Sequence, residues 1–140
     1  MRLLIDTSVI VALIRDDGAA GDVPASHLAR VADDVEVVLS SIVAAELAQG
    51  FCESARTTNE RTRFDVFSRG VTSHTFGFDA AEWYGRVRTL LRKAGTAVGT
   101  MDELIAAHAL ALGADVATLN AKDFARIPGL KVLDWSRPAR

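Results

Sequence analysis

The chain has almost no cysteine, since Cys52 is the only one among its 140 residues. A single cysteine excludes an internal disulfide and a cysteine-based zinc site, and it fits a reducing compartment. The apolar runs near the start are short, and Asp6 interrupts them. They fall far below the roughly 20 residues that a membrane-spanning helix needs, and they do not form a signal peptide. The sequence therefore predicts a cytoplasmic protein that does not enter a membrane.

An excess of charge of one sign is also missing. The chain has 18 acidic and 16 basic residues, a formal net charge of −2 at pH 7, and 49% hydrophobic residues. This balance excludes charge-driven disorder, and it requires a local cluster of cations for any contact with nucleic acid. We find no repeat, linker or low-complexity segment, so residues 1–140 are expected to form one domain with a substantial core.

Apolar runs that alternate with helical patterns predict the fold class. Strands are expected at residues 3–5, 35–39, 71–78, 115–119 and 131–133, with 71–78 at a sheet edge. Helices are expected at residues 9–14, 25–32, 41–50, 57 or 58 to 70, 79–93 and 100–112. This order indicates an α/β domain of three layers, with a central, mainly parallel sheet of four to five strands flanked by helices.

Polar residues at the helix starts predict the caps. Thr7 with Ser8 precedes the first helix, and Asp79 precedes the long helix that ends at Lys93. Thr100 and Glu103 have the spacing of a capping box. His108 lies on the apolar face of that last helix, so we interpret it as a structural residue rather than a ligand.

Four acidic residues differ from the others, which lie in polar surroundings. Each follows a strand, interrupts an apolar run or opens a helix of small residues, and they are Asp6, Glu46, Asp102 and Asp123. Alone, each has an ordinary explanation: a helix cap, an exposed helix stripe, an acid in a first helical turn, and a turn residue. In a parallel sheet, however, the ends of the strands share one edge. The four carboxylates are therefore expected to meet in one cleft.

A cluster of carboxylates points to a metal ion. Two carboxylates about 4 Å apart repel each other by roughly 4 kcal/mol at an effective dielectric constant of 20, so the cluster needs a counter-charge or shifted pKa values. Oxygen ligands favour Mg²⁺ or Mn²⁺ and argue against zinc. Because such ions activate water and neutralise phosphoryl oxygens, the cluster predicts hydrolysis of a phosphodiester.

Four segments of the chain resemble a known family. LIDTSVIVALI, SSIVAAELAQG, GTMDELIAAHALALGA and ATLNAKDF resemble, in this order and spacing, the PIN-domain ribonucleases, and more narrowly the VapC-type toxins of type II toxin–antitoxin systems. The resemblance runs from Met1 to about Trp135. It implies a Mg²⁺- or Mn²⁺-dependent endoribonuclease that leaves a 5′-phosphate and a 3′-hydroxyl. Such a toxin inhibits translation and growth until its antitoxin neutralises it.

The resemblance also assigns residues. The family's catalytic, metal-binding acids fall on Asp6, Glu46, Asp102 and Asp123. The glutamate completes the metal shell or positions the attacking water. Thr7 and Ser8 correspond to hydroxyl groups that support the metal site. Asn120 stands where some members have aspartate, so it either reaches a metal through water or orients the last acid.

Partners follow from a basic stripe and from the resemblance. The helix at 79–93 carries candidate contacts to RNA phosphates, namely Arg86, Arg88, Arg92 and Lys93. The alternative is a solvated helix face. The resemblance implies an RNA substrate, a homodimer, and a VapB-type antitoxin that covers the acidic cleft with a basic segment.

Two other functions are consistent with parts of the sequence. Haloacid-dehalogenase-like phosphatases also have an aspartate after their first strand, as Asp6 is here. They need a second aspartate two residues later, where this chain has Ser8. A PIN-like fold that serves as a binding scaffold is the second alternative. The complete set of four acids argues against it.

Overall fold

Five parallel strands form the central sheet of the computed structural model, which describes residues 1–15, 19–54 and 58–139. The strands are β1 (Arg2–Ile5), β2 (Glu36–Ser40), β3 (Thr72–His74), β4 (Ala114–Thr118) and β5 (Val132–Asp134). Their order across the sheet is β3-β2-β1-β4-β5, which places β1 in the middle. The prediction of a parallel sheet flanked by helices is confirmed.

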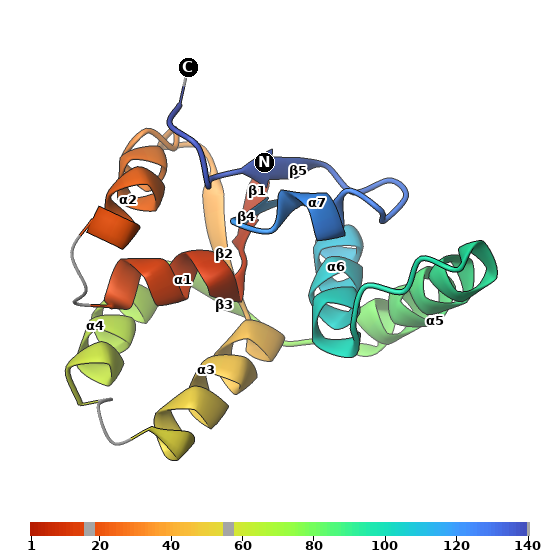
Figure 1. Cartoon of the computed structure of the whole chain (residues 1–140), viewed down its shortest axis with the longest axis horizontal. Helices are drawn as coiled ribbons and strands as arrows, with labels where there is room; N and C mark the ends of the chain where they lie inside the picture. Colours follow the sequence, from red (N-terminus) through yellow and green to blue (C-terminus); the bar gives the residue numbers. More distant parts are fainter. Residues whose placement is uncertain (16–18, 55–57, 140) are drawn as a thin grey trace.

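Helices cover both faces of this sheet (Figure 1). They are α1 (Thr7–Ile14), α2 (Asp22–Ala29), α3 (Ser41–Glu53), α4 (Thr58–Arg69), α5 (Phe78–Ala94), α6 (Thr100–Leu112) and α7 (Ala121–Phe124), and a short 3₁₀ helix spans Ala19–Gly21. In Figure 1, α2 and α4 flank α1 on one side, and α5 lies outside α6 on the other. Of this pair, α6 carries Asp102, one of the four predicted acids.

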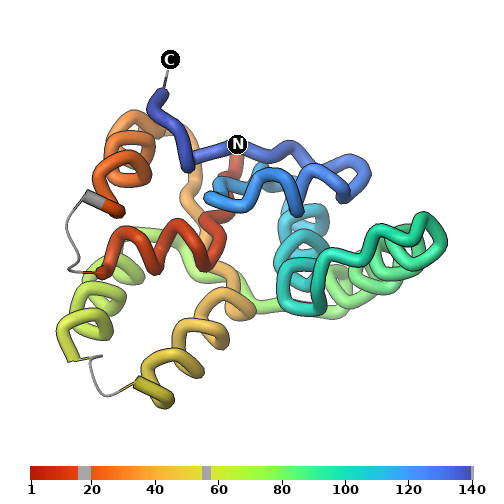
Figure 2. Tube along the Cα trace, in the orientation of Figure 1, coloured from red at the N-terminus to blue at the C-terminus, as the bar shows by residue number. Residues whose placement is uncertain are grey.

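The core is centred on β1. Leu4 pairs in register with Val38 of β2 and with Val116 of β4, and all three side chains are completely buried. Burial on both faces explains the uninterrupted apolar run of this strand. Figure 2 shows the last part of the chain returning to the region of the N-terminus, where His27 of α2 stacks on Trp135 at 5.3 Å between ring centroids.

Several predicted boundaries are corrected by the structure. The edge strand covers only Thr72–His74, and α2 begins at Asp22, three residues earlier than expected. The long helix α5 begins after Gly77, so Asp79 lies in its first turn instead of at the cap. The first helix ends at Ile14, as expected, while the stop signal expected after it at residues 16–18 and a cap at residue 57 lie outside the described residues.

His108 is structural, as predicted. It is buried in α6, its Nδ1 lies 2.7 Å from the Ser40 hydroxyl, and its ring packs edge-on against Phe76. Burial lowers the pKa of His108, because a charged imidazole is less well solvated there. The neutral ring therefore fixes α6 against the end of β2.

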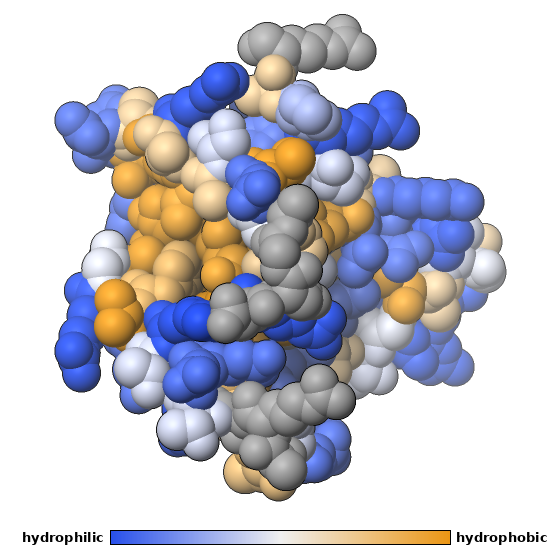
Figure 3. Space-filling view, turned by 60° about the vertical axis from the view of Figure 1, so that its left-hand side comes forward, coloured by the Kyte–Doolittle hydropathy of each residue, from blue (hydrophilic) through white to orange (hydrophobic). Residues whose placement is uncertain are grey.

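One side of the molecule exposes apolar surface. Figure 3 brings forward the side on which α2 and α4 flank α1, and it shows an apolar area between polar margins. Hydrophobic side chains of these helices that are only partly buried include Leu13, Leu28 and Phe67. In the described part of the chain, we find no helix with the length and apolar character needed to cross a membrane.

Candidate active site

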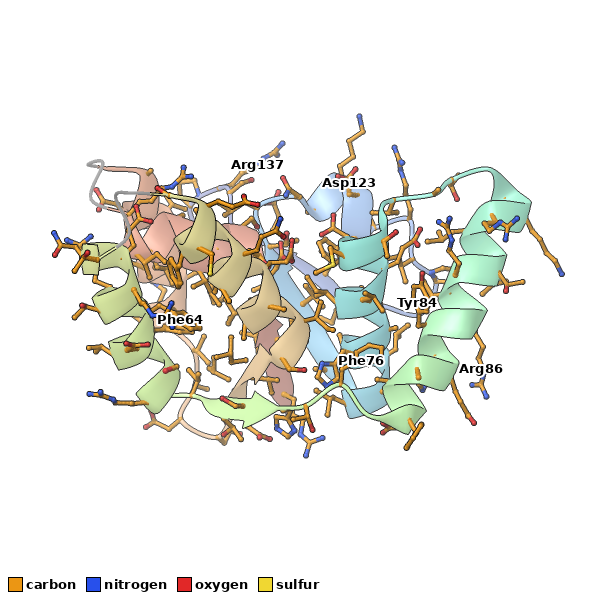
Figure 4. All side chains as sticks on the ribbon, turned by 90° about the horizontal axis from the view of Figure 1, so that it is seen from below. Phe64, Phe76, Tyr84, Arg86, Asp123 and Arg137 are labelled. Atoms are coloured by element: carbon orange, nitrogen blue, oxygen red, sulfur yellow. The ribbon has the colours of Figure 1, made fainter. Side chains whose placement is uncertain are left out.

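The four predicted acids lie on segments that start at one edge of the sheet. Asp6 directly follows β1, and Glu46 lies in the second turn of α3, which follows β2. Asp102 lies in the first turn of α6, and Asp123 lies in α7, which follows β4. Figure 4 shows Asp123 beside the N-terminal end of α6. The parallel topology thus directs the acids to the same edge.

Asp6 is both a helix cap and part of the edge. Its side chain is 2% exposed, and its Oδ1 accepts a hydrogen bond from the Thr7 backbone N–H at 2.7 Å, which caps α1. Its Oδ2 accepts from the hydroxyl groups of Ser8 and Thr118, both at 2.8 Å. Three donors therefore fix the direction of this carboxylate.

Thr7 and Ser8 lie inside α1, so their predicted role as caps is wrong. The Thr7 hydroxyl donates to Oε1 of Glu46 at 2.8 Å, which ties α3 to α1. The Ser8 hydroxyl accepts from the Leu119 backbone N–H at 3.1 Å while it donates to Asp6. Both hydroxyl groups therefore orient carboxylates at the sheet edge where the four predicted acids lie. We call this group of Asp6, Glu46, Asp102 and Asp123 the acidic edge.

Thr118 is a site residue that the sequence did not reveal. The register pairs Ile5 with Ala117, so Asp6 and Thr118 follow as neighbours on adjacent strands. The Thr118 side chain is completely buried, and its hydroxyl donates to Asp6 and accepts from the Asn120 backbone N–H at 2.9 Å. The only signal in the sequence is a hydroxyl residue at the end of a strand.

Asp102 carries the electrostatic cost of the cluster. Partial burial, followed by the negative charges of Asp6, Glu46, Asp123 and Glu103, raises the pKa of Asp102 from 3.8 to about 6. The charges of the other three predicted acids therefore act on Asp102, as expected for carboxylates near one edge of the sheet. A cation placed among them would relieve the repulsion.

The ligand atoms that the acidic edge offers are of the type that a hard divalent ion prefers. All four side chains offer carboxylate oxygens, which suit Mg²⁺ or Mn²⁺ better than zinc. Across residues 1–15, 19–54 and 58–139, no three acidic, histidine or cysteine side chains stand together at the spacing of ligands around one ion. Asp6 and Glu46 are instead turned to protein hydroxyl groups, so binding an ion requires their side chains to adjust.

Asn120 is exposed and directly precedes α7. Its backbone N–H is bonded to Thr118, and its backbone C=O accepts from the N–H of Asp123 at 3.1 Å. The backbone of Asn120 therefore links the end of β4 to the turn that carries the last acid. The role of its side chain stays a prediction.

The predicted basic stripe is corrected at Arg88. Arg88 is directed at α6, where its Nη1 bonds both oxygens of the buried Glu103 at 3.2 and 3.1 Å. Arg86 lies on the outer side of α5, stacked over the Trp83 ring at 5.1 Å (Figure 4). Arg92 and Lys93 are exposed in the last turn of the helix. Contacts of these three cations with RNA stay a prediction.

A cleft of about 720 Å³ leads away from the acidic edge. It runs between α1, α3 and α4, and Thr7 and Glu46 line it together with the apolar side chains of Val11 and Leu47. Carboxylates of Glu46 and Glu60 and the cations of Arg15 and Arg63 therefore share a cleft whose wall is partly apolar.

Comparisons with known proteins agree with this arrangement. The sequence profile of the PIN domain matches residues 3–130. Ribonuclease VapC2 of Rickettsia felis is 32% identical over 137 residues, which cover 98% of this chain and 100% of the relative. The solved structure of VapBC2 from Rickettsia felis, bound to a DNA fragment from its promoter, has a TM-score of 0.87 at 32% identity over 96% of this chain and 99% of that one. VapBC-1 from nontypeable Haemophilus influenzae has a TM-score of 0.84 at 28% identity over 98% and 100% of the two chains.

Proposed function

The chain belongs to the PIN-domain family, and we propose that its acidic edge binds Mg²⁺ or Mn²⁺ and cleaves RNA there. It is a ribonuclease of the VapC type, an endonuclease that serves as the toxin of a toxin–antitoxin pair. The whole chain is proposed to form one PIN domain that acts in the cytoplasm. The observation that carries the metal site is the placement of four carboxylates on segments that start at one edge of the sheet, where burial and the charges of the neighbouring acids raise the pKa of Asp102.

Asp6, Asp102 and Asp123 are proposed to hold the ion. A carboxylate offers about four acceptor directions, and Asp6 uses three of them for protein donors, so it keeps acceptor capacity for an ion once its side chain adjusts. When bound, a divalent ion polarises the scissile phosphate and lowers the pKa of the attacking water. Asp102 and Asp123 would supply further carboxylates, from α6 and α7.

Glu46 is proposed to complete the ion's shell or to orient the water. Thr7 donates to its Oε1, and this hydrogen bond leaves Oε2 as the oxygen available to an ion or a water. Attack of the oriented water on phosphorus breaks the bond to the 3′-oxygen. The products are then a 5′-phosphate and a 3′-hydroxyl.

A protein antitoxin is proposed to close the cleft between α1, α3 and α4. The Glu46 carboxylate suits a basic side chain, and the apolar wall at Val11 and Leu47 suits the apolar face of a helix. The exposed apolar area near α2 and α4 also fits a protein partner, because such areas are uncommon on monomeric proteins (Figure 3). A homodimer stays a prediction.

RNA cleavage by the purified protein tests the metal-dependent function. Cleavage is expected with Mg²⁺ or Mn²⁺, and excess EDTA is expected to abolish it until the ion is restored. Labelled RNA of defined sequence resolved on denaturing gels measures the rate and the product ends. Cleavage that persists in EDTA would contradict the metal site, and a protein that binds RNA but never cuts it would be a scaffold.

Thr118→Val is expected to reduce cleavage roughly 10- to 100-fold, because the buried hydroxyl that orients Asp6 is lost. The substitution keeps the side-chain shape but leaves the Asn120 N–H without its partner, so the free energy of unfolding should fall by about 1–3 kcal/mol. Cleavage rates and urea unfolding measure the two effects. Thr89→Val, which removes a hydroxyl on the exposed side of α5, is the matched control. Equal activity of the two variants would exclude the orienting role.

A further inference from the structure

Glu103 is a buried charge that the proposed chemistry does not use. It follows Asp102 in the first part of α6, and its side chain is 0% exposed. A carboxylate removed from water is costly unless it is paired and hydrogen-bonded. The contacts of Glu103 therefore show which groups compensate for its burial.

Three segments meet at the Glu103 carboxylate. Arg88 of α5 bonds both of its oxygens, at 3.2 and 3.1 Å from Nη1. The backbone N–H of Val98, in the connection between α5 and α6, donates to Oε1 at 3.2 Å. The carboxylate thus joins α5, the connection and α6 at one point.

The start of α6 depends on this junction. Gly99 occupies the cap position with φ 137°, and glycine has no side chain that accepts from the first N–H groups of the helix. The predicted capping box of Thr100 and Glu103 is therefore wrong. Glu103 instead reaches back over the first turn to Val98, and this turn contains Asp102.

The electrostatics of the pair point the same way. Glu103 is a fifth negative charge close to the acidic edge, and it adds to the repulsion on Asp102. The guanidinium of Arg88 neutralises it at a distance of 3.1 Å. Without Arg88, Glu103 would be a buried carboxylate without a counter-charge, next in the chain to Asp102, a proposed metal ligand.

We propose that the Arg88–Glu103 ion pair, with the Val98 N–H, is a positioning device that holds the first turn of α6 so that Asp102 faces the acidic edge. Arg88 and Glu103 are positioning residues and do not touch the ion or the RNA. The inference rests on the proposed function, in which Asp102 binds the ion. It also gives Arg88 a different role from that of the other cations of α5.

The test compares Arg88→Met, Glu103→Gln, their double variant and Arg88→Lys with the full-length wild type. Two quantities are measured on each protein: Mn²⁺ affinity by calorimetry, and amide hydrogen exchange of residues 98–103 relative to the β1 core. Arg86→Met is the matched control, because Arg86 lies on the outer side of the same helix.

Arg88→Met is expected to weaken Mn²⁺ binding at least roughly tenfold and to speed exchange in residues 98–103 more than in β1. The double variant should recover much of both losses, since no buried charge remains and the side-chain carbonyl introduced by Glu103→Gln still accepts from the Val98 N–H. Arg88→Lys keeps the charge and so guards against misfolding, and its losses should be smaller but measurable. Arg86→Met should match the wild type in Mn²⁺ affinity and in the exchange of residues 98–103.

Mn²⁺ affinity within twofold of the wild type in folded Arg88→Met and Arg88→Lys would overturn the inference, even if both proteins melted earlier. Unchanged local exchange in residues 98–103 would overturn it as well. If the wild type binds no Mn²⁺, the proposed metal site fails. The exchange measurement would then still decide whether the pair holds the first turn of α6.

Discussion

Asp102→Asn is expected to lower RNA cleavage by roughly 10²–10³-fold and, in the same protein, to raise the stability of the ion-free fold. The loss of activity follows from the loss of a proposed ligand to the ion. The gain in stability follows from the position of Asp102, which is half-buried and repelled by Asp6, Glu46 and Asp123. Opposite changes in activity and stability are the mark of a group retained for function.

The size and pH dependence of this stabilisation follow from the pKa of Asp102. The rise of the pKa from 3.8 to about 6 would cost the folded state about 3 kcal/mol at neutral pH if Asp102 were fully buried. Because Asp102 is partly exposed, the expected cost is about 1 kcal/mol. Because the pKa of the folded state is the higher one, the wild type loses stability as the pH rises from about 4 to about 6. Asparagine removes that loss, so the variants should differ at pH 7.5 and agree near pH 4.

Urea unfolding in EDTA at these two pH values measures the difference. Asp65→Asn is the matched control, since Asp65 is exposed on α4. It should leave both cleavage and stability unchanged. If Asp102→Asn were less stable than the wild type at pH 7.5, charge repulsion on Asp102 would not destabilise the ion-free fold, and the prediction would be wrong.

Mn²⁺ is expected to stabilise the wild type strongly against unfolding. An ion that binds the folded state alone adds about 2.7 kcal/mol at a concentration 100 times its dissociation constant. The effect should weaken as the pH falls through about 6, because Asp102 then gains a proton that competes with the ion. Melting temperatures with and without Mn²⁺ at pH 7.5 and 5.5 measure this linkage.

Asp102→Asn is the control for the ion-binding measurement. Its melting temperature should respond to Mn²⁺ far less than that of the wild type at pH 7.5. Equal shifts in the two proteins would place the ion elsewhere on the surface, and the acidic edge would then lose its proposed role.

The architecture could be predicted from short-range patterns. The apolar run at residues 3–5 indicates a strand buried on both faces, and helical spacing on either side indicates the parallel arrangement. Helix starts were predicted less well. Asp6, rather than Thr7 or Ser8, caps α1, because the cap depends on which backbone conformation precedes the helix, and sequence preferences for these residues are similar.

The four acids could be named as candidate ligands before the structure, because parallel strands end at a common edge, and their role stays a prediction. Their supporting residues could not. Thr118 is identified by the register of β1 and β4, which brings together residues 112 positions apart. Arg88 was predicted to bind RNA, because the sequence shows a cation on a helix but not the carboxylate that faces it.

Local sequence patterns were enough to predict the parallel sheet and the candidate ligands, and the resemblance of four segments was enough to indicate the family. Neither was enough to identify the partners of those ligands: the hydroxyl groups around Asp6 and the ion pair behind Asp102. Each acid alone has an ordinary explanation, and the shared strand edge of a parallel sheet is what groups the four as candidate ligands. The groups that orient them are ordinary in sequence, and only packing between distant segments gives them their roles.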